Sequence, residues 1–242
     1  MITNSFDEAH FSVIAENIKK IKEEIAEATI KSNRSVDDVR LMAVTKTVCT
    51  EYINYAIENC GIDLIGENKV QELLSKYDGY NLDACSLQFI GHLQSNKVRQ
   101  IVDKVDMIQS VDSLHLAQVI SKESEKFGIT SNILLEINIG DEESKTGFSM
   151  SEFFETLHEI AELDAIRIKG LMTIPPICEN NTILCKYFEK IHNIYVDIKE
   201  KKLDNIDMNI LSMGMSGDYE QAILCGSNLV RIGSSIFGPR IY

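Results

Sequence analysis

Apolar residues recur along this chain in two alternating patterns. Phe11, Ile14, Ile18, Ile21 and Ile25 are three or four positions apart, which predicts an amphipathic helix over residues 10–31 with a charged outer face. Beyond it, short apolar runs alternate with stretches of helical spacing. The apolar runs predict strands at residues 39–45, 62–65, 87–91, 107–111, 133–139, 166–174, 208–213 and 229–237. The stretches between them predict helices near residues 50–60, 68–77, 94–103, 113–127, 150–163, 182–201 and 216–225.

This alternation predicts parallel strands joined by right-handed crossovers. Eight strand–helix units predict a closed (β/α)8 barrel of the α/β class, with an extra N-terminal helix within residues 1–35. An open doubly wound sheet is the alternative. The barrel is favoured because no G-x-G-x-x-G sequence follows the first strand. We expect a single domain over residues 1–242, a length typical of such barrels.

Charge and composition narrow the function. The chain has 24 basic and 37 acidic residues, a net charge of −13, so we expect it to bind neither nucleic acid nor an anionic membrane surface. Residues 1–8 lack the basic and apolar regions of a signal peptide, and no apolar run approaches ~20 residues. The six cysteines form no metal-binding pattern. These features predict a cytoplasmic protein with reduced thiols.

Lys46 is the most informative single residue. It follows the first predicted strand directly, and the carboxyl ends of the strands carry the functional residues of a (β/α)8 barrel. A lysine partly buried at such a position can supply the neutral amine that forms an imine with an aldehyde. The alternative is a solvated lysine at the strand end, which is the commoner situation for this residue type.

Glycine and serine dominate the loops after the seventh and eighth predicted strands. Backbone amides, hydroxyls and the next helix N-terminus can together bind a phosphate there, and Ser216 is expected to cap that helix. Either loop alone could be ordinary, but their occurrence on adjacent strands favours the phosphate interpretation. The residues concerned are Ser212, Met213, Gly214, Met215, Ser216, Gly233, Ser234 and Ser235.

Alternation along the eighth strand places Arg231 and Gly233 toward the barrel lumen and Val230 and Ile232 toward the helices. An amine at strand one, a phosphate site at strands seven and eight and an inward arginine together fit a phosphorylated aldehyde. Pyridoxal 5′-phosphate fits best, because Arg231 can donate to its ring nitrogen and leave that nitrogen unprotonated. The ring is then a weaker electron sink.

Four other residues lie at or beyond the carboxyl ends of predicted strands. Asn68 is expected either to cap a helix or to donate a hydrogen bond inward, and His92 is either structural or placed against an aromatic ligand. Lys145 is interpreted as a solvated loop lysine. Met172 is expected to act mainly through packing.

Segments throughout the chain closely resemble the pyridoxal phosphate homeostasis proteins, relatives of the barrel domain of alanine racemase. The matching segments are AVTK at 43–46, GENKVQE at 66–72, FIGHLQSNK at 89–97, EESKTG at 142–147, GLMTIPP at 170–176, LSMGMS at 211–216 and RIGSSIFG at 231–238. The resemblance implies that Lys46 forms a Schiff base with pyridoxal phosphate, that Arg231 lies beside the pyridine nitrogen, and that the two glycine–serine loops contact the phosphate.

The candidate cofactor-binding residues are therefore Lys46, Asn68, His92, Met172, Ser212, Met213, Gly214, Met215, Ser216, Arg231, Gly233 and Ser234. No catalytic residue and no metal site is expected. One departure from the family pattern is Leu87-Gln88, where an aromatic–histidine pair is usual. We expect it to change packing within the strand and to leave cofactor binding intact.

The resemblance also bears on activity. Related racemases carry a second, β-rich domain with a catalytic tyrosine, and two-base racemisation needs acids or bases on both faces of the substrate. This sequence reaches Tyr242 directly after its eighth strand, so we expect a monomer that binds, buffers and delivers pyridoxal phosphate to apoenzymes without turnover. The alternatives are a single-domain amino-acid racemase and a Schiff-base aldolase; the latter would need a carboxylate beside the lysine, and none is obvious.

Overall fold

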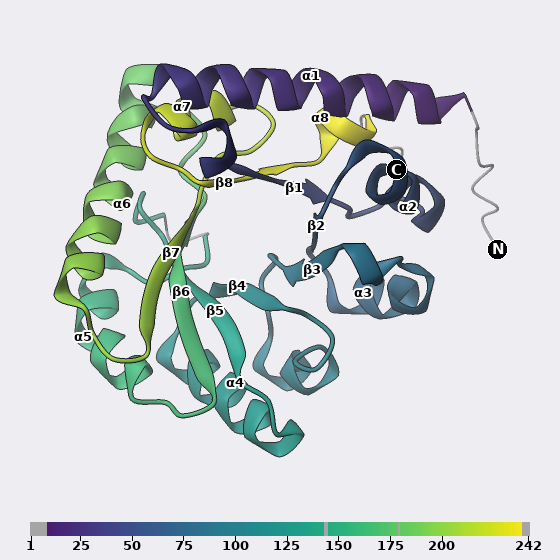
Figure 1. The fold of residues 1–242 in the computed structure, drawn as a ribbon. Coiled ribbons are helices and arrows are strands. Elements are labelled where there is room, and N and C mark those ends of the chain that lie inside the picture. The colour runs from purple at the N-terminus through teal and green to yellow at the C-terminus, as the bar shows by residue number, and fades with distance from the viewer. Residues whose placement is uncertain (1–8, 143–144, 179, 239–242) are drawn as a thin grey trace.

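A closed barrel of eight parallel strands forms the centre of the molecule (Figure 1). The structure is a computed structural model that describes residues 9–142, 145–178 and 180–238. Each strand pairs with its neighbours in sequence order, and β8 closes the ring against β1. The predicted barrel is thereby confirmed. The strands are β1 Arg40–Val44, β2 Leu64–Glu67, β3 Ser86–Phe89, β4 Met107–Val111, β5 Ser131–Ile137, β6 Ile166–Thr173, β7 Ile206–Ser212 and β8 Leu229–Ile232.

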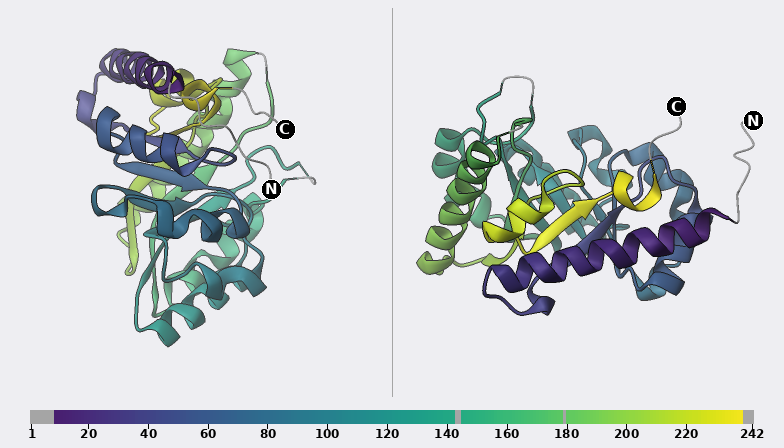
Figure 2. Two further views of the ribbon diagram at one scale, coloured as in Figure 1. Left: turned by 90° about the vertical axis from the view of Figure 1, so that its right-hand side faces the viewer. Right: turned by 90° about the horizontal axis from the view of Figure 1, so that it is seen from above.

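Helices surround the barrel, and the extra N-terminal helix lies across its outside (Figure 2). Within the described residues the helices are α1 His10–Lys31, α2 Thr50–Cys60, α3 Val70–Lys76, α4 Leu114–Phe127, α5 Met150–Ala161, α6 Asn181–Lys201, α7 Tyr219–Leu224 and α8 Ser234–Phe237, with short 3-10 turns η1 Val36–Asp38, η2 Tyr77–Gly79, η3 Leu82–Ala84 and η4 Ser95–Gln100. None of the helices in these ranges is long and apolar enough to cross a membrane. Some residues used in the sequence analysis lie outside the described ranges. They are residues 1–8, Glu143, Ser144 and Tyr242.

Three local predictions need correction. The helix expected near residues 94–103 is the 3-10 helix η4. The strand expected over residues 229–237 ends at Ile232, and α8 follows after Gly233. Ser216 does not cap α7, because that helix begins at Tyr219 and Asp218 is its N-cap residue. The loop after β7 therefore extends to Asp218, and β8 is joined to α8 by Gly233 alone.

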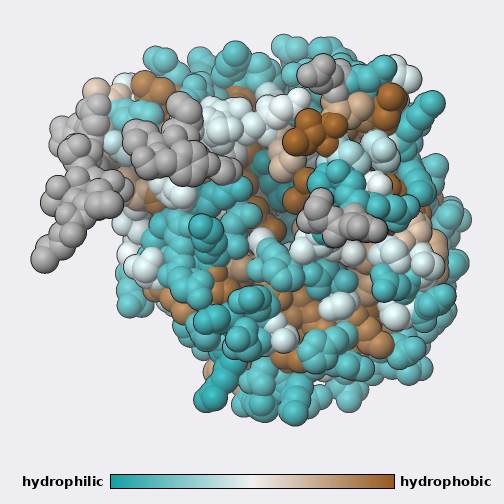
Figure 3. All heavy atoms as spheres, turned by 180° about the vertical axis from the view of Figure 1, so that it is seen from behind, coloured by the Kyte–Doolittle hydropathy of each residue, from teal (hydrophilic) through white to brown (hydrophobic). Residues whose placement is uncertain are grey.

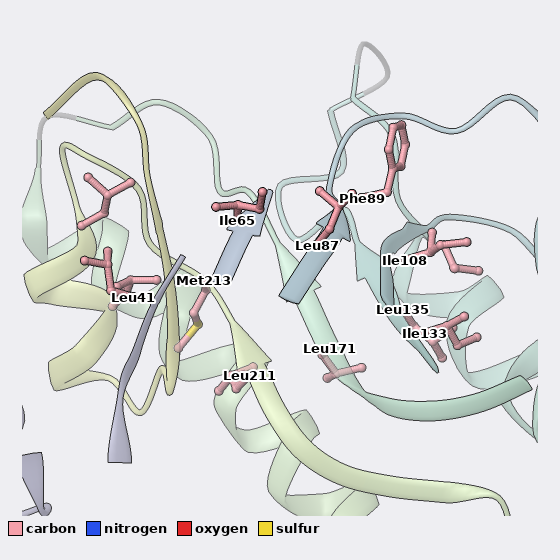
Figure 4. Packing of buried hydrophobic residues seen from close by; sticks show 14 of the residues in the cluster. Leu41, Ile65, Leu87, Phe89, Ile108, Ile133, Leu135, Leu171, Leu211 and Met213 are labelled. Carbon is pink, nitrogen blue, oxygen red and sulfur yellow. The ribbon is translucent and has the colours of Figure 1, made fainter. Parts of the chain in front are cut away.

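The strands bury both of their faces. Alternate side chains face the helices and form one large core (Figure 4), including Leu41, Ile65 and Leu87. The opposite side chains fill the lumen in two smaller groups. One contains Met42, Val44, Leu64, Ile90 and Leu229, and the other contains Met107, Leu134 and Met172. The lumen is therefore a packed interior, as is usual for this fold.

Helix α1 packs along the side of the barrel that β8 and β1 form (Figure 1). Its apolar stripe, Ile14, Ile18, Ile21 and Ile25, is buried, and the helix packs against α2, α7 and α8. Asn17 Nδ2 donates to the carbonyl of Ile236 in α8 at 2.9 Å. The opposite side of the molecule from the viewpoint of Figure 1 is mostly hydrophilic, with scattered apolar groups (Figure 3).

Candidate cofactor site

Lys46 follows one strand of the barrel, β1, and Arg231 lies in the adjoining strand, β8. Lys46 is half-buried, two residues beyond the end of β1. Arg231 is in β8, where it pairs in register with Met42 of β1. As alternation predicts, Val230 and Ile232 pack in the outer core. The amine and the guanidinium thus belong to the pair of strands that closes the barrel.

Arg231 is held inside the lumen by two hydrogen bonds. Its side chain is only 4% exposed; Nη1 donates to Ser212 Oγ at 2.6 Å and Nη2 donates to the carbonyl of Thr173 at 2.9 Å. Burial lowers the pKa of Arg231 to about 10, and the charges of Glu136 and Asp218 oppose that shift. The guanidinium therefore remains protonated near pH 7.

The arginine begins a chain of buried hydrogen bonds that crosses the lumen. Ser212 Oγ donates to Gln109 Oε1 at 2.7 Å, and Gln109 Nε2 donates to Gln88 Oε1 at 2.6 Å. Each donor points away from Arg231, so the positive charge orients every member. Sequence reasoning missed Gln109, although a polar residue next to outward-facing Ile108 in a predicted strand was an available signal. Gln88 is part of Leu87-Gln88, where the sequence departs from the family pattern. That departure therefore affects the buried chain of hydrogen bonds as well as the packing.

The structure brings the two glycine–serine loops together. The amide of Arg231 donates to the carbonyl of Gly214 at 3.0 Å, and Ser234 Oγ donates to Ser216 Oγ at 3.3 Å. Gly214 has φ +98, and a Cβ there would lie 2.7 Å from Cβ of Ala222, so only glycine fits. Ser216 and Ser234 therefore form a hydroxyl pair that joins the loop after β7 to the first residue of α8.

Other predicted members of the phosphate site have different surroundings. The hydroxyl of Ser212 is engaged within the lumen. The side chain of Met213 packs in the outer core, its amide donates to Leu229 and its carbonyl accepts from Ser227. The amide of Met215 donates to Asp218 Oδ1 at 2.5 Å. Among the other serines of these segments, Ser234 and Ser235 are exposed and Ser216 is half-buried.

Asn68, His92 and Met172 lie at other strand ends. Asn68 Oδ1 is buried without a hydrogen-bond partner among the described residues, so it does not cap α3. His92 is exposed, and its Nδ1 lies 3.2 Å from Asp112 Oδ2. Met172 is buried and packs with Met107 and Leu134 in the lumen. Asn68 thus has an unused polar atom, whereas Met172 acts through packing.

A buried carboxylate, Glu136, was also missed. Glu136 pairs in register with Met172, which pairs with Ser212, so the three residues occupy the same level of adjacent strands. Its side chain accepts from Thr146 Oγ1 at 3.0 Å. Burial raises the pKa of Glu136, against the lowering effect of the bond from Thr146. Two signals could have identified Glu136. It follows Leu135, which faces the helices, so Glu136 itself faces the lumen, and it lies beside the predicted site residues Met172 and Ser212.

Lys145 is not the solvated loop residue that the sequence predicts. Its Nζ donates to the carbonyl of Pro175 at 3.0 Å and lies 2.5 Å from Glu142 Oε2. The side chain is 28% exposed. It therefore joins the loop after β5 to the segment after β6.

The residues present fit a phosphorylated aromatic aldehyde. Lys46 supplies a primary amine, Arg231 a fixed cation, and the loops after β7 and β8 supply hydroxyls. The orphaned oxygen of Asn68 is a polar atom that a ligand is expected to satisfy, because buried polar atoms in native proteins are rarely unpaired. The described residues contain no cluster of side chains that could hold a metal ion.

Comparison with known proteins identifies the family. The family model of the alanine racemase N-terminal domain matches residues 11–240. The chain is 37% identical over 227 residues to the pyridoxal phosphate homeostasis protein of Aquifex aeolicus, an alignment that covers 94% of this chain and 98% of that protein. This chain belongs to the pyridoxal phosphate homeostasis protein family.

Solved structures agree with this family assignment. A protein of unknown function from Bifidobacterium adolescentis is 35% identical, with a TM-score of 0.91 over 96% of this chain and 97% of that one. PipY of Synechococcus elongatus, solved with pyridoxal phosphate bound, is 26% identical, with a TM-score of 0.81 over 93% of this chain and all of PipY. Alanine racemase from Streptomyces coelicolor shares the fold at 15% identity and a TM-score of 0.72; the match covers 95% of this chain and 59% of the racemase.

Proposed function

We propose that this chain binds pyridoxal 5′-phosphate through a Schiff base on Lys46 and buffers and delivers that cofactor without catalytic turnover. The observation that carries the proposal is the pairing of a half-buried lysine after β1 with a buried arginine in the adjoining strand β8. Membership of the homeostasis family and the cofactor named in the PipY structure support it. PLP-dependent apoenzymes are the proposed recipients, and we expect a monomer.

Each group has a distinct task in this proposal. The bound cofactor supplies an aldehyde that condenses with a primary amine and an aromatic ring that withdraws electrons. Lys46 provides the amine. Arg231 provides an N–H donor for the ring nitrogen and, being permanently charged, keeps that nitrogen unprotonated. Ser216 and Ser234 provide hydroxyls for the phosphate, together with the backbone at Gly214 and Gly233.

The remaining predicted residues border these groups. Asn68 and His92 are proposed to contact the cofactor from the ends of β2 and β3. Met172 is proposed to form part of the lumen floor, where it packs with Met107 and Leu134. Ser212 is proposed to support cofactor binding by accepting a hydrogen bond from Arg231. Met213 and Met215 are proposed to act only as part of the loop that places Ser216.

A single-domain amino-acid racemase is the second candidate, and one observation favours it. Glu136 is a buried carboxylate with a raised pKa that could hold a proton at the barrel mouth. However, the charge of Asp112 also acts on Glu136, and an ionised Asp112 repels the α-carboxylate of an amino acid. We therefore rank turnover of amino acids below cofactor binding.

An absorbance spectrum before and after borohydride, followed by peptide mapping, tests the proposal. The wild-type protein should show a band near ~420 nm, typical of a pyridoxal imine, and a reduced adduct on Lys46. Lys46→Ala should lose both, whereas Lys69→Ala should keep both because Lys69 is an exposed lysine at the same face. The Ala variant at position 46 should remain folded.

Two results would contradict the proposal. A colourless protein that fails to bind added pyridoxal phosphate would remove it and favour an aldolase acting on a phosphorylated sugar. Sustained, Lys46-dependent turnover of single-enantiomer amino acids would instead favour the racemase.

A further inference from the structure

The backbone around Lys46 is held in an uncommon conformation. Thr45 is fully buried and Thr47 is exposed. Thr47 has φ +64, a left-handed conformation that is unfavourable for a β-branched residue. Strained backbone of this kind persists only where surrounding contacts impose it, and it gathers at functional sites. Contacts from neighbouring residues must therefore hold the turn that contains Lys46.

Lys76, at the end of α3, provides those contacts. Its Nζ donates to the carbonyl of Thr45 at 3.0 Å, to Glu67 Oε1 at 3.0 Å and to Glu72 Oε1 at 2.6 Å. These three bonds use its full set of donors. Glu72 Oε1 also accepts from the amide of Thr47. The peptide group before Lys46 is therefore bonded to Lys76, and the one after it is bonded to Glu72. Lys76 and Glu72 are also bonded to each other.

Glu67 anchors this pair in the protein interior. Its side chain is completely buried, and Oε1 accepts from Thr45 Oγ1 at 2.8 Å and from Tyr80 OH at 2.8 Å in addition to Lys76. Burial raises the pKa of Tyr80, as does the charge of Glu67, so this phenol remains a donor. The second oxygen, Oε2, is buried with no hydrogen-bond partner among the described residues.

Such a cluster is a costly way to stabilise a fold. Burying a lysine and two carboxylates costs solvation, and well-packed apolar side chains often stabilise a protein as well or better. Its bonds also leave the chemistry of Lys46 untouched, because they end on backbone groups to either side of it. A role in positioning accounts for both features.

We infer that Lys76, Glu67 and Glu72 form a clamp that positions Lys46 for its bond to an aldehyde. None of the three touches the proposed cofactor in this inference, so they are positioning residues, and they add no covalent step. The inference rests on the proposed function, since it concerns the same Schiff base. It predicts that loosening the clamp weakens cofactor binding at Lys46 while the lysine itself is retained.

Three variants and a matched control test the clamp. Lys76→Met keeps the length of the side chain and removes its donors, and Glu72→Ala removes the acceptor for Thr47. Glu72→Gln restores an acceptor oxygen at that position. Lys169→Met is the control, because Lys169 donates to Asp207 at 2.8 Å between β6 and β7, away from β1. Each protein is titrated with pyridoxal phosphate at ~420 nm, and its borohydride adduct is mapped.

We expect Lys76→Met and Glu72→Ala to raise the dissociation constant about tenfold, equal to about 1.4 kcal/mol, with the adduct still on Lys46. Glu72→Gln should recover most of the affinity, and Lys169→Met should match wild type. Recovery by the amide would separate positioning from a general loss of stability, which urea unfolding of each apoprotein measures in parallel. Glu72 is 17% exposed, so Glu72→Ala decides the matter if Lys76→Met does not fold.

The outcomes separate this inference from the proposed function. Wild-type affinity in folded Glu72→Ala would overturn the clamp alone, as would an equal loss in Lys169→Met. Equal losses in Glu72→Ala and Glu72→Gln would also overturn it, because the amide keeps the acceptor. A wild-type protein with no band and no adduct would overturn both the clamp and the Schiff base.

Discussion

The amine of Lys46 and the guanidinium of Arg231 are fixed in opposite ways. Beside Lys46, hydrogen bonds from Lys76 and Glu72 of α3, outside the barrel, reach the two flanking peptides. Around Arg231, they reach the guanidinium itself, from Ser212 and Thr173 in the barrel. One half of the site thus fixes a backbone, and the other half fixes a side chain.

The difference follows from the chemistry of the two groups. An amine that forms and releases a covalent bond must change its partners, so constraints on its backbone guide it without competing for its lone pair. A guanidinium keeps its charge throughout, and a rigid set of acceptors can orient it permanently. The same comparison predicts that substitutions in the two halves lower the free energy of unfolding by different amounts. The half around Arg231, called here the β8 half, should contribute more to folding stability than the half around Lys46.

Arg231→Met is the strongest test of that asymmetry. It leaves Ser212, the carbonyl of Thr173 and the nearby charge of Glu136 without their buried partner, so unfolding free energy should fall by about 3 kcal/mol. Urea unfolding of the apoprotein measures this loss. Arg231→Lys should lose less, because it keeps the charge but not the planar fork. A loss below that of Lys76→Met would reverse the comparison.

Gln109→Leu should have a smaller effect within the same half. The substitution removes the acceptor of Ser212 Oγ and the donor to Gln88, so we expect a loss of about 1–3 kcal/mol. Gln88→Leu, at the far end of the chain, should cost less because it removes a single bond. Equal losses of unfolding free energy for the two variants would show that the buried chain of hydrogen bonds does not transmit orientation from Arg231.

Local patterns predicted the parts of the site that depend on a single strand. Strand–helix alternation predicted the barrel, and period-two alternation predicted that Arg231 points into the lumen. The partners of these residues come from distant segments: Gln109 meets Ser212 across the lumen, and Lys76 meets Thr45 from α3. Those pairings depend on register and closure of the barrel, which periodicity within one segment does not contain.

The glycine–serine loops also show what local sequence patterns leave undecided, here the exact ends of helices and strands. Their composition predicted a shared binding surface, and the Ser216–Ser234 contact places them together. Composition did not predict which residue caps α7, because Asp218 and Ser216 are both good N-cap residues. Tyr219 is the first residue of α7, which selects Asp218. The missed end of β8 at Ile232 has a related cause, since Gly233, Ser234 and Ser235 separate its apolar run from Ile236 and Phe237, which belong to α8.

The smallest predicted effect concerns Glu136 and the pH dependence of stability. Because the pKa of Glu136 is raised in the folded state, its protonated form favours folding. Its contribution is therefore fully present below the ordinary carboxyl value of 4.5 and is lost as pH rises through the folded-state pKa. Glu136→Gln, which cannot titrate, should lose less stability than wild type across that rise.

Urea unfolding of both proteins at a series of pH values measures this difference. The two curves should converge below pH 4.5 and separate above it, with the Gln variant the more stable. Thr146→Val removes the bond that lowers this pKa, so it should widen the separation from Glu136→Gln. Parallel curves would mean that the bond from Thr146 and the charges of Arg231 and His92 together offset the burial of Glu136.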